Sequence, residues 1–177
     1  MKKMKRTWAI LLALVLTVAL AVPGFAAEGG YSITITNDKA GHTYEAYQIF
    51  AGTVASDDEQ DVGDGDGITG PMLGDITWGT GVNGDALLAA LKAADDGKYG
   101  ACTTAADVAK ALGAEGATAA DAAAFAEIAA LHLAVVTGTA TEPVNGNYVI
   151  ANLPAGYYLV KDQDGSLQGE EDTATEY

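Results

Sequence analysis

The sequence of 177 residues contains a single cysteine, Cys102, and only four prolines. One cysteine cannot form an intrachain disulfide, so stability must come from core packing or from another kind of crosslink. We expect Cys102 to be a small buried residue beside a helix start, although a lone thiol can also pair between chains.

Basic residues are scarce as well, with nine of them against 24 acidic residues. All 24 acidic residues but only five of the basic ones follow residue 26, which gives that part a net charge of −19. This charge disfavours nucleic acid and anionic membranes as partners and indicates solubility outside the cell.

No hydrophobic run is long enough to span a bilayer. The longest, Trp8–Val22, has 15 residues, whereas a span needs about 20. It follows four basic residues and precedes Pro23-Gly24, an order typical of a secretory signal. We predict that residues 1–26 are a signal peptide cleaved after Ala26 and that residues 27–177 form one exported domain.

Alternating apolar and polar residues predict strands near both ends of this domain. Tyr31–Asn37 and His42–Val54 are separated by a break at Ala40-Gly41, and Met72–Gly79 is a third candidate. In His42–Val54 neither face is purely polar, which indicates a central strand. We expect one face to carry Tyr44, Ala46, Gln48 and Phe50, and the other to carry Glu45, Tyr47 and Ile49.

Two further strands are predicted after residue 146. They are Asn147–Asn152 and Gly156–Asp162, joined by a Leu-Pro-Ala-Gly turn. We expect Tyr148, Ile150, Tyr158 and Val160 to point inward, and Tyr157 and Leu159 to lie on the opposite face.

The middle of the chain is rich in alanine and has helical periodicity. One helix carries Leu87, Leu88 and Leu91 on a shared face and begins at Asn83 or Asp85. Capping-box patterns at Thr104–Asp107 and Thr118–Asp121 predict two more helices, the first ending at Gly113 and the second by Gly138. The last of these helices has an apolar stripe that we expect to face the core, formed by Phe125, Ile128, Leu131 and Val135.

Strands, then helices, then strands within one domain predict a mainly β fold with an α insertion. We expect an antiparallel, immunoglobulin-like sandwich with a helical insert around residues 84–136.

The segment Ser56–Gly67 is acidic and rich in glycine. A calcium site is one interpretation, but the spacing does not fit the twelve-residue calcium loop, because Val62 stands where that loop needs glycine. A solvated loop is the favoured interpretation, and we predict no metal site.

Residues that would form an active site are sparse. His42 and His132 are ninety residues apart, and no glycine-rich phosphate loop, zinc-protease motif or serine-hydrolase motif occurs. Cys102 with His132 as a nucleophile and base has no support in the local sequence. We therefore predict no catalytic residues, no cofactor and no enzymatic activity.

An internal isopeptide bond between lysine and asparagine could replace a disulfide, but it requires a buried lysine beside a carboxylate. Lys39 lies at a turn, and Lys161 lies at a strand end. The core-facing position in YEAYQIF holds Gln48, which lacks the amine. Lys92, Lys98 and Lys110 belong to the helical insert. We therefore expect no such bond.

Three stretches in this order resemble a known family. They are GHTYEAYQIFAG, ITWGTGVNGDALLAALK and NYVIANLPAGYYLVKDQDGSL. Together they resemble the N-terminal domain of the major (shaft) pilins, isopeptide-forming fimbrial proteins that Gram-positive bacteria assemble with sortases. The LPAGYYLV turn is similar to the wider group of collagen-adhesin B-type domains, so GHTYEAYQIF followed by WG and GVN is the more specific part.

The resemblance implies a structural subunit of an adhesive fimbria in the cell wall, with other pilin subunits and a pilus sortase as partners. In the family, the sortase cleaves a Leu-Pro-x-Thr-Gly-like signal and joins it to the lysine of a Tyr-Pro-Lys motif. This sequence has neither motif, so we assign no acceptor lysine. The family's lysine motif lies about one strand beyond Tyr177, so we expect a domain truncated at its C-terminal strand, with an open sheet edge.

The alternative is a secreted or surface adhesin, a binding module that contacts a host protein or glycan. Trp78 and Tyr99 are the aromatic residues that would serve such a contact, although both are equally ordinary core residues.

Overall fold

The computed structural model describes residues 30–54, 73–114 and 116–163, which form two antiparallel sheets and a layer of helices. The predicted signal peptide with Ala26, the acidic segment Ser56–Gly67 and the tail after Gln163 lie outside the described residues.

The smaller sheet has two strands. Strand β1 (Tyr31–Thr36) pairs with β5 (Asn147–Leu153), and the register continues through Thr36 and Asn147. The turn that leads into β5 contains Asn145 and Gly146, both with positive φ, which suits an Asn-Gly pair in a tight turn.

The larger sheet has four strands around β2 (Tyr44–Val54). Strand β6 (Gly156–Asp162) pairs with β2 from Tyr44 to Ala51. Both β4 (Gly138–Ala140) and β3 (Leu73–Trp78) pair with residues of β2 that β6 also contacts, so they share the edge opposite β6. The predicted central position of this strand is confirmed.

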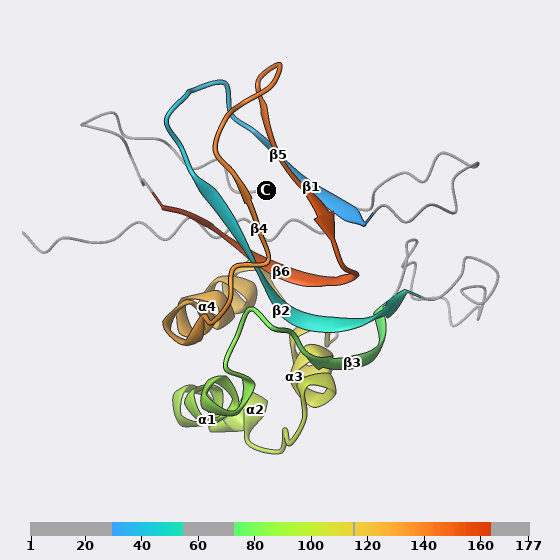
Figure 1. Ribbon diagram of the computed structural model, residues 1–177. Coiled ribbons are helices and arrows are strands. Elements are labelled where there is room, and N and C mark those ends of the chain that lie inside the picture. Colours follow the sequence, from blue (N-terminus) through green and yellow to red (C-terminus); the bar gives the residue numbers. More distant parts are fainter. Residues whose placement is uncertain (1–29, 55–72, 115, 164–177) are drawn as a thin grey trace, which may run out of the picture.

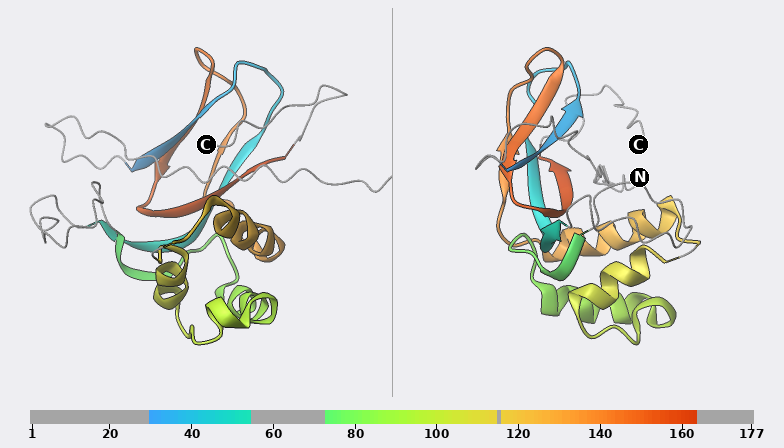
Figure 2. Two further views of the ribbon diagram at one scale, coloured as in Figure 1. Left: turned by 180° about the vertical axis from the view of Figure 1, so that it is seen from behind. Right: turned by 90° about the vertical axis from the view of Figure 1, so that its right-hand side faces the viewer.

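Each face of β2 borders a separate hydrophobic core. Between the two sheets, Tyr44 and Ala46 pack with Ile33, Tyr148, Ile150, Leu153, Tyr158 and Val160. On the other face, Tyr47 and Ile49 pack with Leu159 and with the buried residues of the helices, and we call this cluster the helix-side core. Figures 1 and 2 show β2 between the β1–β5 sheet on one side and the helices on the other. The predicted inward residues of β5 and β6 are confirmed, as is the position of Tyr157 and Leu159 on the opposite face of β6. The arrangement is compatible with a β-sandwich.

One facing prediction for β2 was wrong. Phe50 lies in the helix-side core with Tyr47 and Ile49, and not with Tyr44 and Ala46. The register with β6 shifts between Gln48 and Phe50, which makes Ile49 the extra residue of a β-bulge. A bulge reverses the alternation beyond it, so two successive apolar side chains enter the same core.

The helices begin as their capping residues predict. Asn83 caps α1 (Gly84–Ala94), and Thr104 and Thr118 form complete capping boxes at α3 (Ala105–Leu112) and α4 (Ala119–Ala129). A short helix, α2 (Asp96–Tyr99), lies between α1 and α3. Gly113 ends α3, as expected.

The predicted extent of the last helix was wrong. Helix α4 ends at Ala129, the 3-10 turn η2 (Ala130–His132) follows, and Leu133 is extended. The chain is then held by hydrogen bonds from Ala134 N to Gly81 O and from Val135 N to Thr80 O. Bonds to a neighbouring segment thus replace the helical bonds, and Leu131 and Val135 are 79% and 62% exposed. The insert predicted around residues 84–136 therefore ends its helical part at His132.

Candidate functional site

A buried polar cluster lies where β2 begins and β6 ends. His42 is buried, and its Nδ1 lies 2.6 Å from Oδ2 of Asp162. The imidazole stacks on the Tyr44 ring at 5.8 Å and meets the Tyr148 ring edge-on at 6.4 Å. His42 is a candidate from the sequence alone but Asp162 is not, because their proximity depends on the pairing of Tyr44 with Asp162 across the sheet.

The two tyrosines of this cluster have hydrogen-bond partners for their hydroxyl groups. Tyr148 donates to the backbone oxygen of Lys39 at 2.7 Å, and Tyr44 accepts from Nδ2 of Asn37 at 2.8 Å. The two rings are 4.9 Å apart and nearly perpendicular. The cluster thus ties the turn between β1 and β2 to β5 and β6, which is a structural arrangement.

A second buried polar residue, Gln48, lies at the middle of β2. Its Nε2 donates to the backbone oxygen of Ala155 at 3.0 Å, and its backbone N–H donates to Oγ1 of Thr137 at 3.1 Å. The backbone at Gly79 and Gly81 lies very close to the backbone of Gln48. A Cβ added at Gly79 would lie 2.2 Å from the Gln48 oxygen, and one added at Gly81 would lie 2.3 Å from the Gln48 nitrogen. The site therefore holds a neutral amide in a space without room for further atoms.

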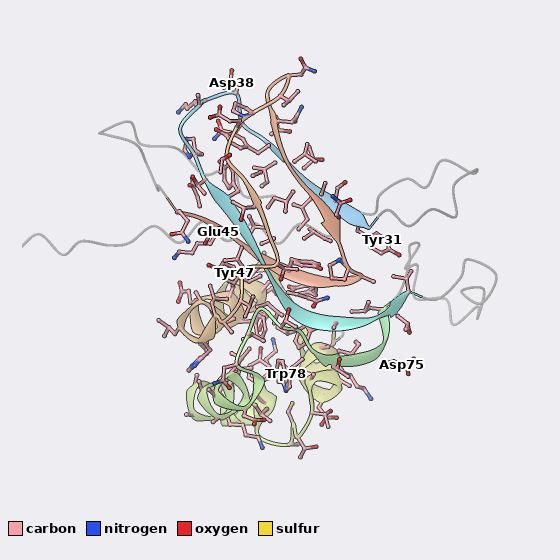
Figure 3. All side chains as sticks on the ribbon, viewed as in Figure 1. Tyr31, Asp38, Glu45, Tyr47, Asp75 and Trp78 are labelled. Carbon is pink, nitrogen blue, oxygen red and sulfur yellow. The ribbon has the colours of Figure 1, made fainter. Side chains whose placement is uncertain are left out.

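Burial raises the pKa of several tyrosines. The pKa of Tyr158 rises to about 12 through burial, and that of Tyr99 rises to about 12 through burial and the nearby Asp121 and Asp95. The pKa of Tyr47 also rises to about 12, through burial and a 2.6 Å hydrogen bond to Glu45, the two residues labelled on β2 in Figure 3. These phenols are protonated at neutral pH and lack the lowered pKa of an activated nucleophile.

The histidines and the cysteine occupy separate parts of the fold. Cys102 is buried in the helix-side core, as predicted, and burial raises the pKa of its thiol. His132 lies in η2, and its backbone oxygen accepts from Asn83 N at 2.9 Å. No hydrogen bond joins Cys102 to His132, and no group of three metal-ligating side chains occurs within the described ranges.

All five lysines after residue 26 lie in the described part, and none is buried. Lys39 and Lys110 are exposed, and the other three are partly exposed. Lys98 pairs with Asp121 at 2.6 Å, between α2 and the start of α4. None of these lysines has the buried surroundings that an internal isopeptide bond requires.

The two aromatic residues considered for ligand contact belong to the helix-side core. Tyr99 is 4% exposed. Trp78 stacks on Phe50 at 5.4 Å, and Gly84 lies so close to its indole that an added Cβ would be 2.2 Å away. Both residues therefore have a packing role.

Several exposed apolar side chains lie elsewhere, and three of them are close together in the sequence. Leu131, Val135 and Val136 are exposed on the segment between α4 and β4, which is bonded to the backbone of residues 80–83. Sequence periodicity assigned Leu131 and Val135 to the core, and only the early end of α4 reveals them as surface residues.

Within the described ranges, no helix is long and apolar enough to cross a membrane. Neither family models, nor curated proteins, nor solved structures gave a match to this chain.

Proposed function

We propose that this chain is a structural subunit of a cell-surface fimbria, specifically the N-terminal domain of a sortase-assembled pilin with an immunoglobulin-like, collagen-adhesin B-type sandwich. The observation that carries the proposal is the pairing of β2 with β6. These strands contain the YEAYQIF and GYYLVKD segments of the family resemblance, and they form the shared wall of both cores. Residues that the resemblance rests on thus build the framework of the domain.

The side chains support a structural role as well. The buried polar residues His42 and Gln48 bond to neighbouring strands and turns, and Cys102 packs among apolar side chains. A subunit of an extracellular fibre needs a rigid domain, and interlocking strands with partnered polar groups provide one. Other pilin subunits and a pilus sortase are the proposed partners, and the cell wall is the proposed location.

The proposal is tested on the bacterium that carries the gene. Antibodies against residues 27–177 should detect a ladder of high-mass species in cell-wall extracts that withstands boiling in detergent. Deleting the pilus sortase should collapse the ladder to the monomer, and deleting an unrelated housekeeping protease should not. A monomer in both the wild type and the sortase mutant would contradict the proposal. If the ladder is present, a Tyr-Pro-Lys motif in the frame downstream of the Tyr177 codon would locate the acceptor lysine.

A second candidate is a binding module that contacts a host protein. The exposed Leu131, Val135 and Val136 favour it, because apolar residues held on a bonded segment are typical of contact surfaces. Substituting Leu131→Ser together with Val135→Ser should then reduce bacterial adhesion to host cells while leaving the ladder intact. Val149→Ser, at an exposed position on β5, is the matched control. Unchanged adhesion would exclude this surface as the binding site.

A further inference from the structure

The tripeptide Val-Asn-Gly occurs twice in the chain, in two different structural settings. One copy, Val82–Gly84, lies at the start of α1, and the other, Val144–Gly146, lies in the turn before β5. These copies contain the only asparagines of the sequence that precede a glycine. Because glycine has no side chain, its backbone nitrogen is open to approach by the amide carbon of the preceding asparagine. The two copies share this local chemistry, so any difference in their reactivity comes from the fold.

Asn83, in the first copy, is held in place at the start of α1. Its amide oxygen accepts from Ala86 N at 3.3 Å, and its backbone N–H donates to His132 O at 2.9 Å. Gly84 is buried, and a Cβ added there would lie 2.2 Å from the Trp78 indole. Rotation of Asn83 about its backbone or side-chain bonds would break these contacts, so its amide is fixed by the fold.

Asn145, in the second copy, lies at the exposed tip of a hairpin. Two hydrogen bonds between Val144 and Asn147 close this two-residue turn, at 2.8 and 3.1 Å. Within the described ranges, neither the side-chain amide of Asn145 nor the N–H of Gly146 makes a hydrogen bond. The turn therefore restrains Asn145 through two bonds only, and hairpin tips open locally at far lower free energy than core elements do.

We propose that Asn145 is a site of spontaneous deamidation in the folded protein, whereas the fold protects Asn83. The nitrogen of Gly146 loses its proton to hydroxide and bonds to Cγ of Asn145, and the Cγ–Nδ2 bond breaks to release ammonia. Water then hydrolyses the resulting succinimide at either of its two carbonyl groups. The products are an aspartate or an isoaspartate at position 145. This inference does not depend on the fimbrial function proposed above.

Both products would disturb the end of the β1–β5 sheet. An isoaspartate adds one carbon to the main chain of the two-residue turn, and either product adds a carboxylate. A Cβ added at Gly146 would lie 3.8 Å from Cβ of Asp38, which Figure 3 labels, so the new charge is close to a like charge. Gly146 O also accepts from Asn37 N at 3.0 Å, in register with the β1–β5 ladder. We therefore expect modification to weaken the pairing of β1 with β5 at this end.

Peptide mapping by mass spectrometry tests the proposal on the chain 27–177, incubated at body temperature in mildly alkaline buffer. In the folded chain, aspartate and isoaspartate should form at position 145 about tenfold faster or more than at position 83. In urea, where neither setting exists, the two positions should react at similar rates. Equal rates in the folded chain would overturn the proposal. So would a folded chain that stays unmodified at Asn145 while the same position reacts in urea.

Hydrogen–deuterium exchange measures the consequence for the sheet. The variant Asn145→Gly lacks the amide and keeps a pair of residues that suits positive φ, so it is the matched control. After the same incubation, the peptide that covers Ile35–Asn37 should exchange faster in the parent chain than in Asn145→Gly, and the two should agree before incubation. Equal exchange after incubation, in a parent sample shown to be modified, would overturn the expected weakening of the β1–β5 pair.

Discussion

Nδ1 of His42 lies 2.6 Å from Oδ2 of Asp162, and this contact joins the chain just before β2 to the end of β6. The side chains are only 2% and 9% exposed, so water does not replace a lost partner easily. Replacing Asp162 by alanine leaves the imidazole buried without this acceptor. We expect Asp162→Ala to lower the free energy of unfolding by about 2–3 kcal/mol.

Urea denaturation followed by tryptophan fluorescence measures this change. Glu142→Ala removes an exposed carboxylate and is the control, expected to change stability by less than about 0.5 kcal/mol. Equal stability of the two variants would mean that the His42–Asp162 contact contributes little.

The second prediction concerns Phe50, which the bulge at Ile49 directs into the helix-side core. Its ring lies 5.4 Å from Trp78, 5.9 Å from Phe125 and 5.7 Å from Tyr157. Phe50→Ala should cost about 3–5 kcal/mol because it leaves a cavity between β2 and the helices. Val149→Ala, on the exposed face of β5, should have little effect. Thermal unfolding by calorimetry measures both, and a small effect of Phe50→Ala would contradict the assigned core.

The third prediction concerns the close backbone approach at Gln48. In Gly81→Ala the new Cβ would lie 2.3 Å from the backbone nitrogen of Gln48, so the loop after β3 must move away. We expect a loss of about 1–3 kcal/mol. Gly113→Ala is the control, because its nearest contact is 3.6 Å and its φ of −91° suits alanine. If the two substitutions shift the urea midpoint equally, the close approach at Gly81 is wrong.

The fourth prediction concerns acid stability. Hydrogen bonds from Thr103 and Thr104 lower the pKa of Asp107 from 3.8 to about 2. The pKa of Asp121 is also lowered, by the Lys98 hydrogen bond first and then by Thr118. A lowered pKa in the folded state stabilises the protein above the unfolded value, and this contribution is lost as the pH falls from about 4 to 2.

Helical circular dichroism and urea midpoints between pH 5 and about 2 test this dependence. The variant Asp107→Ala should be less stable than the parent at pH 5, and the difference should shrink toward pH 2. A difference that stays constant over this range would show that the Asp107 carboxylate is not responsible.

Local signals in the sequence predicted most elements of the fold. Thr104 and Thr118 each precede an aspartate by three residues, and such capping boxes act within one turn, independently of tertiary contacts. The strand alternation in β5 and β6 was equally local. The bulge at Ile49 was not predictable in this way, because it depends on the register between β2 and β6.

The candidate site was harder to predict for the same reason. His42 and Asp162 are 120 residues apart in sequence, and nothing near either residue specifies the other. The end of α4 was missed because Leu131 and Val135 continue its apolar periodicity, while the bonds that end it come from Thr80 and Gly81. Helix propensity favours a longer α4, but hydrogen bonds to Thr80 and Gly81 stabilise an extended segment there instead.

The pairing of β2 with β6 has a consequence for the order of folding. Contacts within residues 84–132 are local and form quickly, whereas the β2–β6 ladder closes a loop of more than a hundred residues. A chain that emerges from the ribosome N-terminus first would expose both apolar faces of β2 until β6 is synthesised. The helices can cover one of these faces earlier, since α1, α3 and α4 all precede β6 in the sequence. The helical insert would thereby shield one apolar face of β2 from aggregation while the rest of the chain is synthesised.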